Sequence, residues 1–201
     1  MTEHRASGTA CPVWSPEDCV GTEHCPPRCP RFVDHEGTPL LIREFEADDR
    51  AALVEMYEDV DARSRTLGLP PRSQSELEHW LDSLTRGGWN LLAFERGTDR
   101  VVGHIGAAPA DGDEPEFVVF VRDGYRGRGL GTELVQQAVA HAAARDHDAL
   151  GLDVARDNDL AVAVYENVGF EIDDETALDV SMRLSMDSPV ATRARLPPAQ
   201  R

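Results

Sequence analysis

The sequence contains no lysine. All 20 of its basic residues are arginine, and 37 acidic residues outnumber them, so that the formal net charge is −17. A Walker nucleotide-binding loop requires a Gly-Lys-Ser/Thr sequence, and the absence of lysine therefore excludes that class of phosphate site. A chain this acidic also has no basic face that could displace the counterions of DNA or RNA, so we do not expect nucleic acid as a partner.

Long apolar runs are missing as well. No run approaches the roughly 18 residues that a membrane-spanning helix needs, and the N-terminal residues lack the apolar core of a signal peptide. We therefore expect a cytoplasmic protein with no membrane partner. The lysine-free, acidic composition is typical of halophilic proteins, whose charged surfaces stay hydrated in concentrated salt, although a GC-rich genome would also favour arginine over lysine.

The composition divides the chain into three parts. Residues 1–36 contain all four cysteines and show little periodicity, so they are predicted to form an irregular, Cys-rich extension. Residues 37–187 carry the periodic segments and are long enough for one domain with its own core. Residues 188–201 hold three prolines and three arginines without a hydrophobic pattern, and we expect a disordered tail there.

Hydrophobic periodicity in residues 37–187 predicts both strands and helices. This mixture favours an α/β fold built on a mixed sheet. Strands are predicted at 39–45, 89–95, 101–108, 117–121, 150–154, 170–172 and 178–186. Helices are predicted after Asp48, after Ser73 or Ser75, from Leu130, and after Asp157 or Asn158.

One stretch, residues 116–141, organises the rest of the chain. Phe117–Val121 is an apolar run typical of a buried strand, Arg122–Gly131 is polar and contains four glycines, and helical spacing of apolar residues resumes at Leu130. A strand, a glycine-rich turn and a helix in succession direct backbone N–H groups at a phosphate, and Arg126 and Arg128 add positive charge. The alternating glycines do not fit the G-x-G-x-x-G spacing of dinucleotide-binding folds.

The glycine-rich turn is similar to a known motif. Arg126-Gly127-Arg128-Gly129-Leu130-Gly131 resembles Gln/Arg-x-x-Gly-x-Gly/Ala, the acyl-CoA-binding motif of the GNAT acetyltransferase superfamily. Residues 158–170, Asn-x-x-Ala-x-x-x-Tyr-Glu-x-x-Gly-Phe, resemble the second block of the same family. The resemblance covers about residues 39–186 and implies an α/β (α+β) fold, with a mixed, mostly antiparallel central sheet flanked by helices.

The resemblance also implies a site for acetyl-CoA. Backbone amides of the glycine-rich turn would hold the pyrophosphate, the preceding strand would bind the pantetheine arm, and Asn158 would contact the pantetheine region. The implied cofactor-binding residues are Val119, Phe120, Val121, Arg126, Gly127, Arg128, Gly129, Leu130, Gly131, Thr132 and Asn158.

Acyl transfer from a thioester to an amine requires a proton donor for the departing thiolate, and the second block implies that Tyr165 is this general acid. Tyrosine has a pKa near 10 and is protonated at neutral pH. Asn158 and Tyr165 are seven residues apart, about 700° around a helix, so the two side chains share a face. A tyrosine on a packed helix is otherwise an ordinary core residue.

The residue that deprotonates the amine is left open by the sequence. Glu116 stands close to where histone-type lysine acetyltransferases carry a glutamate that acts through water. Asp153 is similar in position to a glutamate of N-terminal-amine acetyltransferases, but its side chain is one methylene shorter. Either carboxylate could equally be a solvated residue at a strand end, and His104 in the neighbouring strand is a further option.

The cysteines form a second pattern, outside the family resemblance. Cys11, Cys19, Cys25 and Cys29 follow the spacing C-x7-C-x5-C-x3-C, with His24 beside them. Without a secretion signal a disulfide framework is disfavoured, and four thiols in an irregular segment favour a structural zinc site. The spacing lacks paired C-x2-C knuckles, so an iron–sulfur cluster and uncoordinated thiols remain alternatives.

Together these observations predict an acetyl-CoA-dependent N-acetyltransferase in which an amine attacks the thioester directly. An acyl-CoA-binding regulatory module without turnover and a metal-dependent interaction protein are the alternatives. The acceptor amine, a small molecule or a protein amine, is not named by the sequence, although the acidic surface favours a cationic one. The oligomeric state is likewise open, with a homodimer as one option.

Overall fold

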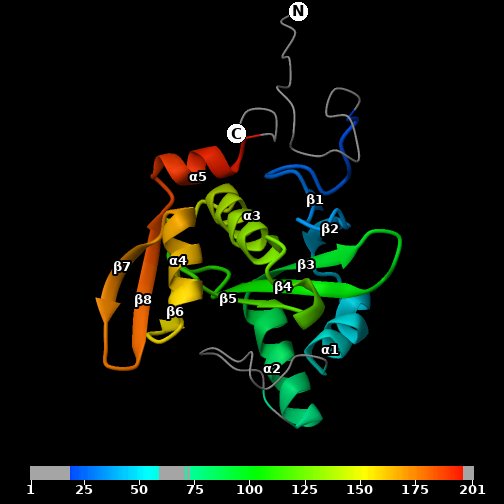
Figure 1. The fold of residues 1–201 in the computed structure, drawn as a ribbon, viewed down its shortest axis with the longest axis horizontal. Coiled ribbons are helices and arrows are strands. Elements are labelled where there is room, and N and C mark those ends of the chain that lie inside the picture. The colour runs from blue at the N-terminus through cyan, green and yellow to red at the C-terminus, as the bar shows by residue number, and fades with distance from the viewer. Residues whose placement is uncertain (1–18, 59–70, 72, 197–201) are drawn as a thin grey trace, which may run out of the picture.

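The computed structural model describes residues 19–58, 71 and 73–196, and within them one sheet has helices on both of its faces (Figure 1). The strands are β1 (Arg31–Val33), β2 (Pro39–Glu44), β3 (Trp89–Glu95), β4 (Val101–Ala108), β5 (Glu116–Val121), β6 (Ala149–Ala155), β7 (Glu171–Glu175) and β8 (Asp179–Ser185). The helices are α1 (Arg50–Glu58), α2 (Gln74–Gly87), α3 (Leu130–Ala144), α4 (Asp159–Val168) and α5 (Pro189–Ala194), and short 3-10 turns are η1 (Ala47–Asp49) and η3 (Asp123–Tyr125).

The sheet has eight strands in the order β1-β2-β3-β4-β5-β6-β8-β7. All neighbouring strands are antiparallel except β5 and β6, which run parallel and pair where Glu116 lies opposite Gly151. That pairing is at the beginning of β5, so the two strands diverge toward their C-terminal ends. The predicted mixed, mostly antiparallel sheet flanked by helices is confirmed.

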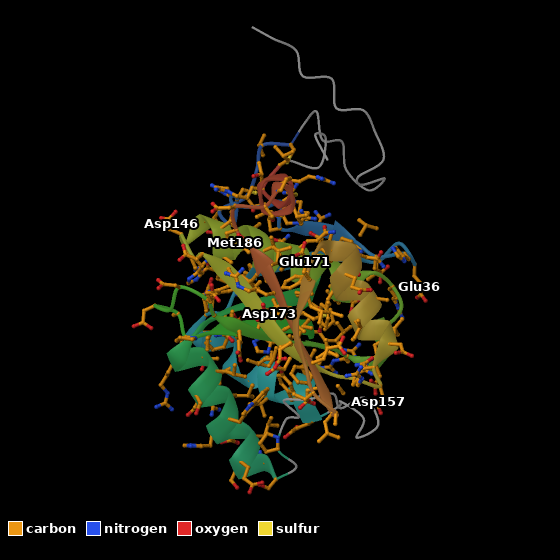
Figure 2. The ribbon with its side chains drawn as sticks, turned by 90° about the vertical axis from the view of Figure 1, so that its left-hand side faces the viewer. Glu36, Asp146, Asp157, Glu171, Asp173 and Met186 are labelled. Carbon is orange, nitrogen blue, oxygen red and sulfur yellow. The ribbon has the colours of Figure 1, made fainter. Side chains whose placement is uncertain are left out.

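Two apolar cores cover the two faces of the sheet. Alternate residues of β5 divide between them: Phe117 packs with α3 and α4, whereas Phe120 packs with α1 and α2. Figure 2, turned so that β7 and β8 face the viewer, shows α2 and α4 on opposite sides of the sheet. The helices α1 and α2 pack on β3 and β4. On the same face of the sheet, β6 from Gly151 onward and β8 carry exposed or half-buried side chains.

The structure differs from the sequence-based expectation at both ends of the domain. The predicted disordered tail is wrong at residues 189–194, because α5 forms there and packs on α3. Ser188 caps this helix by accepting a hydrogen bond from the Ala191 amide, and Pro189 occupies its first turn, where no amide donor is needed. In the predicted irregular N-terminal extension, residues 31–33 form β1, which pairs with β2. Within the described residues, no helix is long and apolar enough to cross a membrane.

Candidate active site

A cleft opens where β5 and β6 diverge. It is closed at one end by the glycine-rich loop that leads into α3 and along one side by α4. Its lining residues are Phe117, Val118, Val119, Phe120, Val121, Arg126, Gly127, Gly131, Val135, Asp153, Val154, Asn158, Leu160, Ala161, Val164 and Tyr165. The cleft therefore brings together residues from both sequence blocks.

The glycine-rich loop holds its shape through glycine conformations. Gly127 and Gly129 have φ values of 69° and 87°, in the left-handed region that side chains disfavour. Gly129 is the N-cap of α3 and supplies no side chain, so the amides of the first helical turn face outward without a capping oxygen. A Cβ added at Gly131 would meet only the Val121 side chain, at 3.9 Å, so this position is open toward the cleft.

The two arginines of the loop have different surroundings. Arg126 lines the cleft, and its Nε donates to the Val121 carbonyl at 3.1 Å and pairs with Asp123 at 3.1 Å. Arg128 is absent from the cleft lining; its guanidinium pairs with Glu36 at 2.8 Å and lies over the ring of Tyr125. Of the two predicted phosphate-binding arginines, Arg126 has the more direct access to the cleft.

Three other predicted loop residues do not line the cleft. Leu130 is fully buried in the core beneath the loop, whereas Gly129 and Thr132 are absent from the cleft lining. On the strand, Val119, Phe120 and Val121 all line the cleft.

Helix α4 carries Asn158 and Tyr165 to the same cleft, as their seven-residue spacing predicts. Asn158 caps the helix, since its side-chain oxygen accepts a hydrogen bond from the Ala161 amide at 3.2 Å. The ring of Tyr165 packs edge-on against Phe117 and Phe170, and burial raises the pKa of its hydroxyl to about 12. The hydroxyl is therefore protonated at neutral pH and can donate a proton.

The two carboxylates lie on the opposite face of the sheet from Tyr165. Asp153 alternates with Leu152 and Val154, which face the α3 core, so its exposed carboxylate points to the other side. Its Oδ1 accepts a hydrogen bond from Ser181 on β8 at 2.6 Å, and the residue lines the cleft. Glu116 is exposed at the point where β5 and β6 pair, and it is absent from the cleft lining. The cleft thus passes through the sheet, with Tyr165 on one side and Asp153 on the other.

His104 is excluded as the base by its burial. Its ring is fully enclosed between β4 and α1, and burial lowers its pKa to about 3. Asn90 donates from Nδ2 to the Leu84 carbonyl, which turns its Oδ1 toward His104. His104 therefore donates from Nε2 to Asn90 at 2.9 Å and accepts at Nδ1 from the Tyr57 hydroxyl at 2.6 Å.

No local sequence pattern marks this network, because its members are far apart in the chain. Gly106 lies opposite Asn90 in the sheet and leaves room for the Asn90 side chain. A Cβ at this position would lie 2.4 Å from Asn90 Oδ1. The hydrogen bond between Asn90 and His104 thus requires glycine at that position.

The predicted zinc site is not supported. Cys11 lies outside the described residues, and among the residues that the structure describes no group of three or more His, Cys, Asp or Glu side chains could hold a metal ion. Cys19 and Cys25 are exposed and Cys29 is half-buried.

A family model for an acetyltransferase (GNAT) domain matches residues 39–171. The chain belongs to the GNAT acetyltransferase family. The resemblance noted in the two sequence blocks is confirmed, and membership makes the protein an N-acetyltransferase. The part of the chain before residue 39, including β1, lies outside the GNAT match.

The GNAT domain also resembles individual proteins. Over 137 residues it is 25% identical to an L-methionine sulfoximine/L-methionine sulfone acetyltransferase of Pseudomonas aeruginosa, a match covering 65% of this chain and 80% of the relative. The GNAT domain of S. lividans PAT has a TM-score of 0.66 at 22% identity and covers 77% of this chain and 95% of its own. The yncA protein of Salmonella typhimurium, solved with its cofactor acetyl-CoA, has a TM-score of 0.59 at 20% identity, covering 74% of this chain and 95% of its own. The last two are likenesses of fold.

Proposed function

We propose that this protein transfers the acetyl group of acetyl-CoA to a primary amine by direct attack of the amine on the thioester. The observation that carries the proposal is the cleft through the sheet, which has an open phosphate loop at one end and a protonated tyrosine inside it. Leu160 adds support, because it lines the cleft and yet is 80% exposed, and an apolar pantetheine arm would cover it.

The reaction needs two proton transfers, and each face of the sheet supplies the residue for one of them. The amine nitrogen bonds to the carbonyl carbon, the C–S bond breaks, and the electron pair leaves with sulfur. Tyr165 donates its phenolic proton to that sulfur and afterwards regains a proton from solvent. The amine gives up its proton to Asp153, or through water to Glu116, on the face that α1 and α2 leave open.

The acceptor reaches the thioester from this open face. Its carboxylates, Glu116 and Asp153 among them, favour an acceptor that carries positive charge before it reacts. The Pseudomonas relative acts on L-methionine sulfoximine and L-methionine sulfone, so the α-amine of a small amino acid is the first acceptor to test.

The test is turnover and binding measured on the same protein. CoA release is followed with a thiol reagent against L-methionine sulfone, L-methionine sulfoximine, a polyamine and a peptide with a free N-terminus. For Tyr165→Phe we expect kcat to fall about 100-fold or more while the Kd for acetyl-CoA is unchanged, because the hydroxyl acts on the leaving group. A variant that keeps kcat within twofold of wild type would remove Tyr165 from the mechanism, and a wild type that binds acetyl-CoA but acetylates no amine would contradict acetyl transfer.

A further inference from the structure

The N-terminal segment just before the GNAT match runs along the beginning of α3. Arg28 is buried and donates from Nε and Nη2 to the two carboxylate oxygens of Glu133, each at 2.8 Å, in the first turn of α3. One residue further on, the Cys29 carbonyl accepts a hydrogen bond from Gln137 at 2.7 Å. Figure 1 shows this segment and β1 close to α3. The segment is therefore attached to the helix whose N-terminus carries the phosphate loop.

The turn between β1 and β2, residues 34–37, is fixed directly to the glycine-rich loop. The His35 amide donates to the Arg128 carbonyl at 3.0 Å, and the Arg128 guanidinium pairs with Glu36 and with Asp34. Asp34 is buried, and its Oδ1 accepts from the amides of Glu36 and Thr38, which fixes the shape of the turn. Figure 2 shows Glu36 on the same side of the molecule as α4.

These contacts place the ring of His35 against the N-cap of α3. Its Nε2 lies 2.7 Å from the position that a Cβ on Gly129 would occupy, and the residue is exposed. Arg128 pairs with the carboxylates on both sides of His35, so its guanidinium offsets part of their negative charge beside the imidazole. An imidazole N–H can donate to a phosphate oxygen in either protonation state of the ring.

We propose that His35 binds a phosphate group of acetyl-CoA, together with the amides of the glycine-rich loop. The proposal rests on the proposed function, which supplies the phosphate-bearing ligand. It adds a side chain from outside the GNAT match to the cofactor site, and it explains why the turn is tied to Arg128 by one backbone hydrogen bond and two ion pairs.

Binding of CoA by calorimetry tests the proposal with three variants. His35→Leu retains an apolar side chain but has no donor, and we expect its Kd for CoA to rise about tenfold, the loss of one hydrogen bond to a charged group. His35→Gln restores an N–H donor and is expected to bind within about threefold of wild type. His79→Leu, at an exposed histidine of α2 on the other face of the sheet, is the matched control and is expected to bind as wild type.

Two results would overturn this inference alone: wild-type affinity in His35→Leu, or an equal loss in His35→Leu and His35→Gln, which would indicate packing and not a donor. A wild-type protein that does not bind CoA would overturn the proposed function together with this inference. Because His35 is exposed, the thermal midpoint is expected to be unchanged in both variants.

Discussion

His104 is the centre of a buried hydrogen-bond chain that one substitution would break. The chain runs from the Leu84 carbonyl through Asn90 and His104 to the Tyr57 hydroxyl, and His104 has no exposed surface. His104→Phe keeps an aromatic ring of similar breadth but removes both ring nitrogens. The Tyr57 hydroxyl and Asn90 Oδ1 would then be left in the interior without these partners.

The expected loss is large compared with the stability of the protein. Each buried polar group that loses its partner costs about 1–3 kcal/mol, so two such groups cost about 2–6 kcal/mol. A domain of this kind has a free energy of unfolding of about 5–15 kcal/mol. His104→Phe is therefore expected to leave the protein folded but markedly less stable.

Urea denaturation followed by circular dichroism measures this loss, and a second variant isolates its cause. Adding Tyr57→Phe to His104→Phe removes one of the two unpaired groups, and we expect about 1–3 kcal/mol of the stability to return. A loss below about 1 kcal/mol in the single variant, or further destabilisation in the double variant, would refute the reasoning.

The same network makes stability depend on pH. Burial lowers the pKa of His104 to about 3, whereas a histidine in the unfolded chain titrates near 6.5. As the pH falls below about 6.5, His104 binds a proton in the unfolded state but stays neutral in the folded state. The free energy of unfolding therefore falls by up to ~1.4 kcal/mol per pH unit until about pH 3. Above about 6.5 both states are neutral at this residue, and its full contribution is present.

The remaining predictions concern the proton transfers. Asp153→Asn is expected to lower kcat/KM by about 10- to 100-fold, because it removes the proposed proton acceptor. Glu116→Gln, matched in charge change, is expected to have a smaller effect because Glu116 does not line the cleft. If Glu116→Gln gave the larger loss, the two carboxylates would exchange roles. Because the pKa of Tyr165 is raised to about 12, we expect no loss of kcat from its ionisation up to about pH 10; a loss centred near pH 8 in wild type that vanishes in Tyr165→Phe would contradict this.

The sequence predicted the central part of the fold well, since periodicity there is strong. β5, the glycine-rich loop and α3 follow one another within 30 residues, and each is specified by its own local pattern. The cleft follows from the same stretch, because β5 and the loop supply about half of its lining.

Weak local patterns explain the differences in secondary structure. All five residues of β7 are exposed, so no buried alternation marks it, and only residues 171 and 172 fell within the predicted strand at 170–172. Helix α5 has six residues and begins with Pro189, and its one sequence signal is the Ser188-Pro189 pair at its start. Packing against β8 determines where β7 lies, and packing against α3 determines where α5 lies.

Contacts between distant residues explain what was missed at the site. His35 and Gly129 are 94 residues apart, and His104 meets Tyr57 across 47 residues. A motif shows which residue types are available, but only the folded chain shows that Arg128 pairs with Glu36 and that Asp153 and Tyr165 lie on opposite faces of the sheet.

The most direct test of the central claim is calorimetric titration of acetyl-CoA into wild type, Gly131→Asp and Gly124→Asp. Both substitutions add one negative charge at a glycine of ordinary φ, but Gly131 opens into the cleft, whereas a Cβ at Gly124 meets nothing and lies outside the cleft lining. The account predicts saturable binding to wild type and Gly124→Asp, and a loss of about 100-fold or more in Gly131→Asp. Equal affinity in all three proteins, or none in folded wild type, would contradict the assignment of the cleft as the acetyl-CoA site.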